Sequence, residues 1–127
     1  MEIKPISSGS QAGNCYILDK GKGNQKLMIE CGVEPKKIRK ALDNDFSSVS
    51  GCFVSHKHYD HSSAIPYLLK RCVDVYTLPY VLDDFGVHTH RTHKIEPFSD
   101  VQLDGWRVRP FDLVHSVENV GFLVKTE

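Results

Sequence analysis

Short apolar runs and apolar–polar alternation predict strands near both ends of the chain and around its middle. The runs are bounded by Gly, Asn, Asp and Pro, which favour turns. The spacer "DKGKGNQ" and the Asp104-Gly105 pair are both typical of hairpin turns, because such residues tolerate a tight reversal of the backbone. The predicted strands are 14–18, 26–30, 50–55, 73–78, 119–127 and the two arms of a hairpin within 100–111.

Helix signals fall between these strands. Residues 34–44 repeat apolar positions at a spacing of three and four, residues 62–71 can be capped by a serine, and residues 79–86 begin with proline and end with glycine. Pro66 is compatible with the second helix only in its first turn. This order predicts the α/β (α+β) class, with a mixed sheet covered by helices on one face. We find no repeat, low-complexity tract or linker, and expect one domain over residues 1–127.

Composition narrows the class of protein. A chain of 127 residues, 40% hydrophobic and 25% charged, is ordinary for a soluble globular domain. Lys plus Arg equals Asp plus Glu, at 16 each, so overall charge favours neither nucleic acid nor an anionic membrane, although a local basic groove stays open. We find no apolar signal region and no run that would span a membrane. The cysteines form no CxxC pair, so we expect reduced, mostly buried thiols and a cytoplasmic location. They are Cys15, Cys31, Cys52 and Cys72.

The candidate chemistry lies in "FVSHKHYDHSSA", residues 53–64. His56 and His58 are two positions apart at the end of a predicted strand, so their imidazoles can point the same way. Asp60 and His61 follow where a helix begins, and can point at a second, nearby place. Imidazole with carboxylate suits zinc, iron or manganese, and two sites on one short loop would suit a two-metal hydrolase. The alternative is a polar surface loop that is rich in histidine.

Several motifs resemble the metallo-β-lactamase-fold superfamily. "HKHYDH" fits its HxHxDH signature, and "SSGSQAGNCYIL", "LMIECG" and "FDLVHSVENVGFLV" resemble, in order, an opening SGSxGNxY strand, an LIDCG segment and the strand with the next metal-binding histidine. The opening strand is similar to that of small bacterial and virus-encoded metallo-hydrolases related to a DNA-repair exonuclease. The resemblance implies an αββα sandwich, of which this chain would be about the first half.

The same resemblance implies a set of roles. His56, His58 and His115 would hold a first metal ion, and Asp60 and His61 would contribute to a second. Asp60 would be the catalytic residue that orients the attacking water or takes its proton. We expect two Zn²⁺ ions in a complete site, with Mn²⁺ or Fe as alternatives. The expected function is metal-dependent hydrolysis, of the phosphodiesterase or nuclease type, and small esters stay open as substrates. Two competing readings are an inactive half-domain that binds metal or a partner, and a zinc-stabilised structural protein.

The chain departs from the family pattern in three ways. Glu30 stands where an Asp is usual, which places its supporting contacts in question, and Ser116 replaces an Asp after the third-motif histidine. The family's bridging Asp and last metal-binding His have no counterpart here, so we expect a homodimer or a missing C-terminal half. Residues that could substitute as ligands, or simply occupy an exposed connecting loop, are Glu118, His88, His90 and His93.

Overall fold

A computed structural model describes residues 1–21, 25–113 and 118–126. Within these residues nine strands form two sheets, and four short helices and one 3₁₀ turn connect them. The strands are β1 Glu2–Ser7, β2 Cys15–Asp19, β3 Lys26–Ile29, β4 Val49–Val54, β5 Val75–Thr77, β6 Thr92–Lys94, β7 Val101–Leu103, β8 Trp106–Asp112 and β9 Val120–Thr126. The helices are α1 Pro35–Ala41, α2 Tyr59–Ser62, α3 Ile65–Lys70 and α4 Pro79–Phe85, with the 3₁₀ turn at Phe46–Ser48.

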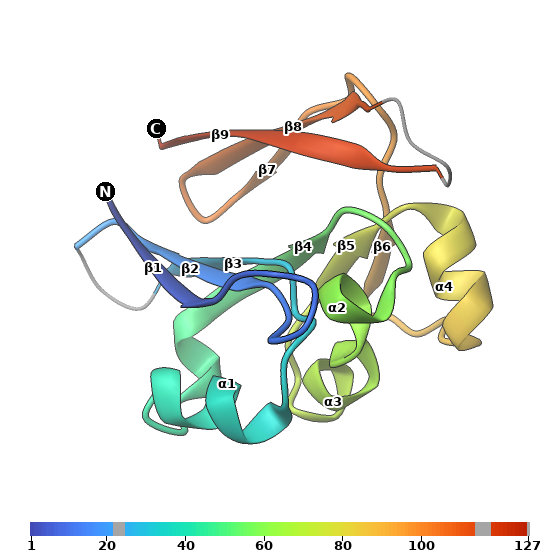
Figure 1. The fold of residues 1–127 in the computed structure, drawn as a ribbon. Helices are drawn as coiled ribbons and strands as arrows, with labels where there is room; N and C mark the ends of the chain where they lie inside the picture. The colour runs from blue at the N-terminus through green and yellow to red at the C-terminus, as the bar shows by residue number, and fades with distance from the viewer. Residues whose placement is uncertain (22–24, 114–117, 127) are drawn as a thin grey trace.

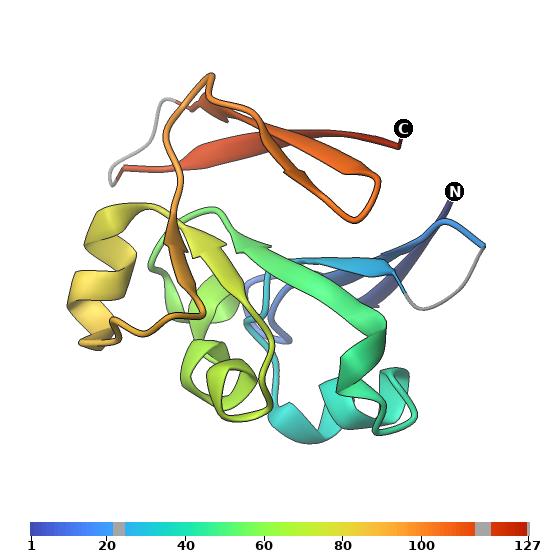
Figure 2. The same cartoon turned by 180° about the vertical axis from the view of Figure 1, so that it is seen from behind.

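The larger sheet is mixed and has the order β1-β2-β3-β4-β5-β6. Strands β1 to β3 pair antiparallel, whereas β3 to β6 pair parallel. Parallel neighbours need crossover connections, and the helices supply them. Figures 1 and 2 show α1, α2 and α3 against one face of this sheet and the antiparallel β7-β8-β9 sheet across the other. The predicted fold class, a mixed sheet with helices on one face, is confirmed, and a small second sheet is already present.

The core lies between the two sheets and under the helices. Phe53 of the central strand β4 is fully buried and stacks on Tyr76 of β5, with ring centroids 4.7 Å apart. Phe122 of β9 packs edge-on against the Phe53 ring, with ring centroids 5.7 Å apart. This contact joins the smaller sheet to the larger one. Trp106 is fully buried and its indole N–H donates to the carbonyl oxygen of Gln25. Trp106 therefore fastens the hairpin of the smaller sheet to the segment before β3.

Three local predictions were incomplete. Strand β1 was missed because its first four residues are exposed at a sheet edge, so its sequence carries no clear apolar alternation. Strand β6 was missed because its three residues are polar, and the region was expected to be a loop. The predicted helix 62–71 is confirmed as the shorter α3, with Pro66 in its first turn as required, and a separate turn of helix, α2, precedes it and ends at Ser62.

In the described part of the chain, no helix is long and apolar enough to cross a membrane. The extent of the domain over residues 1–127 stays a prediction.

Candidate metal centre

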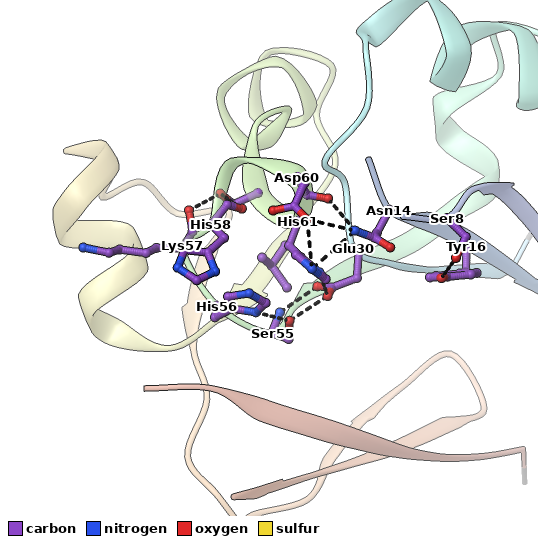
Figure 3. Close-up of polar contacts among 12 residues, drawn as sticks. Ser8, Asn14, Tyr16, Glu30, Ser55, His56, Lys57, His58, Asp60 and His61 are labelled. Carbon is purple, nitrogen blue, oxygen red and sulfur yellow. Dashed lines mark hydrogen bonds and ion pairs between the residues drawn. The ribbon is translucent and has the colours of Figure 1, made fainter. Parts of the chain in front are cut away.

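The histidine loop follows the carboxyl end of β4, which lies between β3 and β5 in the larger sheet. This is the edge of an α/β sheet at which ligands commonly bind. His56 is buried and directly follows the buried Ser55, whereas His58 is the N-cap residue of α2. Asp60 and His61 lie within that helix. The chain turns from strand to helix over residues 55–58, and thus presents all four side chains in one place (Figure 3).

The side chains lie at separations that suit a metal. The His56 ring is 4.8 Å from the His58 ring and 4.2 Å from the His61 ring, between centroids. The Asp60 Oδ2 atom is 3.5 Å from His61 Nε2. Two ligands of a tetrahedral zinc ion, each about 2.1 Å from it, lie about 3.4 Å apart. Asp60 and His61 therefore fit two neighbouring ligands of one ion, and the donor set is the nitrogen and oxygen mixture that zinc, iron and manganese accept.

Glu30 links the residues of the centre through hydrogen bonds. It is buried, lies at the end of β3 with φ of 65°, and its backbone N–H donates to the carbonyl oxygen of Phe53 at 2.8 Å. Its Oε1 accepts from the Ser55 N–H at 2.8 Å, and its Oε2 accepts from the Ser55 hydroxyl at 2.6 Å. The same Oε2 forms a short contact with His61 Nδ1. The longer arm of Glu30 therefore reaches its partners, which answers the question raised by its replacement of Asp.

These contacts assign the imidazole tautomers. The Ser55 hydroxyl has one proton, which it donates to Glu30, so the 2.7 Å contact between Ser55 Oγ and His56 Nδ1 requires Nδ1 to be the donor. His61 Nδ1 likewise donates to Glu30. Both rings then direct Nε2 away from the Glu30 carboxylate. Metal-binding histidines are arranged in this way when a second group holds the other ring nitrogen.

Among the described residues, Glu30, His56 and His61 place donor atoms within 4.8 Å of one another and so form a possible metal site. This set differs from the predicted ligands, since it includes Glu30 and leaves out His58 and Asp60. Both Glu30 oxygens already accept hydrogen bonds, and one of them accepts two. We therefore interpret Glu30 as the group that holds the ligand histidines.

The electrostatic environment favours a positive charge at His61. Partial burial by itself would lower the pKa of His61, but the hydrogen bond and charge of Glu30, with a smaller effect of Asp60, outweigh it and raise the pKa above the ordinary value. A proton on Nε2 lies toward the Asp60 carboxylate. A metal ion bound there would replace that proton, so proton and metal compete for one position.

Two glycines allow close packing of the backbone around Asp60. A Cβ atom on Gly32 would lie 1.9 Å from the Asp60 carbonyl carbon, and one on Gly13 would lie 1.8 Å from the Gly32 oxygen. Asn14 N–H donates to the Asp60 carbonyl at 2.8 Å, and the Asn14 side-chain amide lies 3.3 Å from His61 Nε2. Cys31 N–H donates to the His61 carbonyl at 2.9 Å. The motifs around Gly13 and Gly32 thus serve to position Asp60 and His61.

The sequence analysis assigned no site role to Asn14, Ser55 or the two glycines. Ser55 could have been noticed from its place directly before the histidine motif. The glycines gave no signal alone, because their partners are far along the chain.

Other predicted residues lie elsewhere or outside the description. His115 and Ser116 lie outside the described residues. His88 Nε2 lies 3.1 Å from Asp83, and His93 stacks on Tyr76 and lies 2.8 Å from Asp74. His90 and Glu118 are exposed. In the described ranges, none of these four joins the donor group around His56.

The cysteines are free, and three are buried, as expected. Burial raises the pKa of the Cys15 and Cys52 thiols, so they stay protonated and are poor metal ligands. The remaining two are Cys31, which is buried, and Cys72, which is exposed.

A cavity of about 580 Å³ borders the centre at Asp60. Its lining includes Gln11, Lys37 and Tyr59. Tyr59 is 77% exposed, and so is available to a ligand. The site therefore has adjoining space for part of a substrate.

Comparison with known proteins agrees with this geometry. Residues 9–124 match the family described as the metallo-beta-lactamase superfamily. Cleavage and polyadenylation specificity factor subunit 3 of Dictyostelium discoideum is 37% identical over 76 residues, which are 54% of this chain and 10% of that protein. Probable RNase MJ4 of Methanocaldococcus jannaschii is 44% identical over 52 residues, 39% of this chain and 12% of that protein.

The fold is shared with the metallo-beta-lactamase fold protein YhfI from Bacillus subtilis, with a TM-score of 0.74 and 16% identity over 97% of this chain and 57% of that one. This chain therefore spans about a tenth of the two curated relatives and little more than half of the solved structure. With 116 matched residues, from 9 to 124, the chain belongs to the metallo-beta-lactamase superfamily.

Proposed function

We propose that this chain carries the first part of a metal-dependent hydrolase of the nuclease type. The observation that carries the proposal is the cluster of His56, Asp60 and His61, whose rings and carboxylate are held at ligand separations by Glu30 and Asn14. One curated relative is named as a cleavage factor and another as a probable RNase, which favours a phosphodiester substrate.

The possible metal group among the described residues supports a metal centre, and we propose that it holds a pair of ions. His56 and His58, with His115, would hold one ion, and Asp60 and His61 would contribute to the second. When bound, such a pair lowers the pKa of a water molecule and stabilises charge on a phosphoryl group. We propose Zn²⁺, with Mn²⁺ or Fe as alternatives, because the donors are imidazole and carboxylate.

The chain's own residues have separate tasks in this proposal. Asp60 is the catalytic residue, which orients the attacking water and takes its proton through the carboxylate. Glu30 and Ser55 keep His56 and His61 in the tautomer that presents Nε2. Asn14 holds the Asp60 backbone, so that the carboxylate stays at a fixed place.

The surroundings of Asp60 support a nucleic-acid substrate. The exposed ring of Tyr59 can stack on a base, and the adjoining cavity has room for a nucleotide portion. Lys37, in the lining of the same cavity, supplies positive charge for phosphates. Small esters are the alternative substrate class.

A homodimer or a C-terminal half would complete the site. An apolar groove of about 460 Å³ opens between the two sheets, lined by residues of β1, β2, β3 and β9. Ile3 is 61% exposed there, and an open apolar groove of this kind favours a covering partner. The free thiols also favour the reducing cytoplasm as the location.

The test measures metal content, size in solution and cleavage on the same sample. The chain is loaded with zinc or manganese, sized by light scattering, and assayed on single-stranded RNA, single-stranded DNA and an activated phosphodiester. We expect His58→Ala and Asp60→Asn to lower cleavage by about 100-fold or more, while the matched His90→Ala stays within about twofold. His58→Ala also releases metal.

The opposite outcomes are equally clear. A chain that never binds zinc or manganese contradicts the proposal. A chain that binds metal but cleaves none of these substrates, alone or as a dimer, supports the competing function of a metal-binding or partner-binding module. This second function stays an alternative because the chain spans only a small part of its relatives' length.

A further inference from the structure

We propose that Tyr80 is a positioning residue whose hydroxyl clasps the histidine loop to the backbone at Glu118, beside β9, and so fixes the loop that carries His56 and His58. This inference rests on the proposed metal binding. The hydroxyl accepts a hydrogen bond from the Lys57 backbone N–H at 3.1 Å and donates one to the Glu118 carbonyl oxygen at 2.6 Å. One oxygen atom therefore joins segments that are 61 residues apart in the sequence, from Lys57 to Glu118.

The two joined segments are the ones that carry candidate ligands. Lys57 lies between His56 and His58, so its N–H belongs to the loop that sets both rings. Glu118 follows His115 by three positions. Since the two segments come from different sheets, local secondary structure alone does not set their separation. A contact between them therefore fixes the position of the loop that carries His56 and His58.

Tyr80 is held on a rigid support. It lies in the first turn of α4, which begins at Pro79, and the next two residues of the helix, Val81 and Leu82, are buried. Lys57 also forms an ion pair with Asp84 of the same helix, at 3.4 Å. Helix α4 is therefore fixed to the core on one side and to the histidine loop on the other.

The hydroxyl is protonated across the range of ordinary pH. Partial burial is the main cause that raises the pKa of Tyr80 above its usual value, and the neighbouring Glu118 and Asp84 charges add to it, while the Lys57 N–H acts in the opposite direction. A neutral hydroxyl can donate and accept at once, which both contacts require. Phenylalanine would fill the same space but provide neither contact.

Neighbouring backbone contacts show what the clasp adds. Val120 N–H donates to the Ser55 carbonyl oxygen at 3.2 Å, and Leu113 N–H donates to the Asn119 carbonyl oxygen at 3.3 Å. The first joins β9 to the residue before His56, and the second pairs the chain on both sides of residues 114–118. Tyr80 adds a tie at Lys57, one residue beyond His56. The histidine loop is thereby held at Ser55 and at Lys57, on either side of His56.

The experiment compares Tyr80→Phe with wild type and with Tyr16→Phe. Tyr16 is the matched control, because its hydroxyl also makes a hydrogen bond, to Ser8 Oγ at 3.0 Å, but does not contact the histidine loop. Zinc affinity is measured by competition with a chromophoric chelator, folding stability by urea unfolding of the metal-free proteins, and exchange of the Lys57 amide by NMR. We expect about tenfold weaker zinc binding and faster Lys57 exchange in Tyr80→Phe only.

A purely structural role would have another signature. If Tyr80→Phe lowers metal-free stability but binds zinc as tightly as wild type, the positioning role is wrong. It is also wrong if Tyr16→Phe weakens zinc binding equally. If the wild-type chain itself fails to bind zinc, the proposed function has failed, which is a different result from failure of the clasp.

Discussion

The two sides of the candidate metal centre are built in different ways. On the larger sheet, Glu30, Ser55, His56 and His61 form one buried hydrogen-bonded network, supported by close backbone packing at Asp60. Beside the smaller sheet, Glu118 precedes β9 with an exposed side chain that is not in the donor group, and only its carbonyl oxygen is joined to the histidine loop, through Tyr80. The comparison teaches that folding of the chain preorganises one side of the centre before metal binds, while the other side depends on contacts between the sheets.

The largest effect is expected where the backbones pack most closely. In Gly32→Ala the new Cβ would lie 1.9 Å from backbone atoms of Asp60, so one of two main-chain segments must move. We expect a loss of about 3 kcal/mol in the free energy of unfolding, measured by urea denaturation. Gly86→Ala is the control, since its Cβ meets nothing within 4 Å and only its φ of +66° is unfavourable. It is expected to cost about 1 kcal/mol. If Gly32→Ala and Gly86→Ala lost the same free energy of unfolding, close packing at Asp60 would not be the cause.

The next effect tests the network itself. Glu30→Gln keeps the size of the side chain but leaves only one oxygen for donors that now occupy two. We expect zinc affinity to fall by about 10- to 100-fold, measured by chelator competition. Glu30→Asp is expected to weaken binding as well, because the shorter arm loses reach, although Asp is usual in the family. Glu96→Gln, at an exposed glutamate, serves as the control. Tight zinc binding in Glu30→Gln would mean that the network does not set the ligands.

A smaller effect follows from the raised pKa of His61. A group whose pKa is higher in the folded state stabilises the fold below its unfolded pKa, about 6.5, and loses that contribution as pH rises through the folded pKa. The metal-free protein should therefore lose stability from its network as pH rises above about 6.5. Zinc affinity should increase over the same range, because the competing proton leaves. Unfolding curves between pH 6 and 8, compared with those of Glu30→Gln, isolate this contribution, which the variant should lack. An unchanged difference between the two proteins across that range would contradict it.

Much of the larger-sheet side could be predicted from the sequence. The spacing of His56 and His58 at the end of an apolar strand was enough to place both rings together, because the geometry of a strand end is local. Asp60 and His61 were placed correctly at the beginning of a helix for the same reason. The roles of these residues as ligands stay predictions.

What escaped prediction depends on contacts between distant segments. The pairing of Gly32 with Asp60 and the clasp of Tyr80 with Glu118 follow from how strands order themselves in a sheet, and no spacing along the chain reports that order. Strand β6 shows the same limit, because its polar residues form a strand only through pairing with β5. Such features can be identified only in the folded structure, in which the strands are paired.

The place of Glu30, Ser55, His56 and His61 along the chain has a consequence for synthesis. These four residues lie within positions 30–61, whereas Glu118 comes 57 positions after His61. At about 5–20 residues per second, a ribosome takes roughly 3 to 11 seconds to add that interval. A nascent chain would thus display the imidazoles of one side before the other side exists. The order in which the chain is made therefore sets a time window in which the candidate ligands His56 and His61 can meet metal ions before residue 118 has been added.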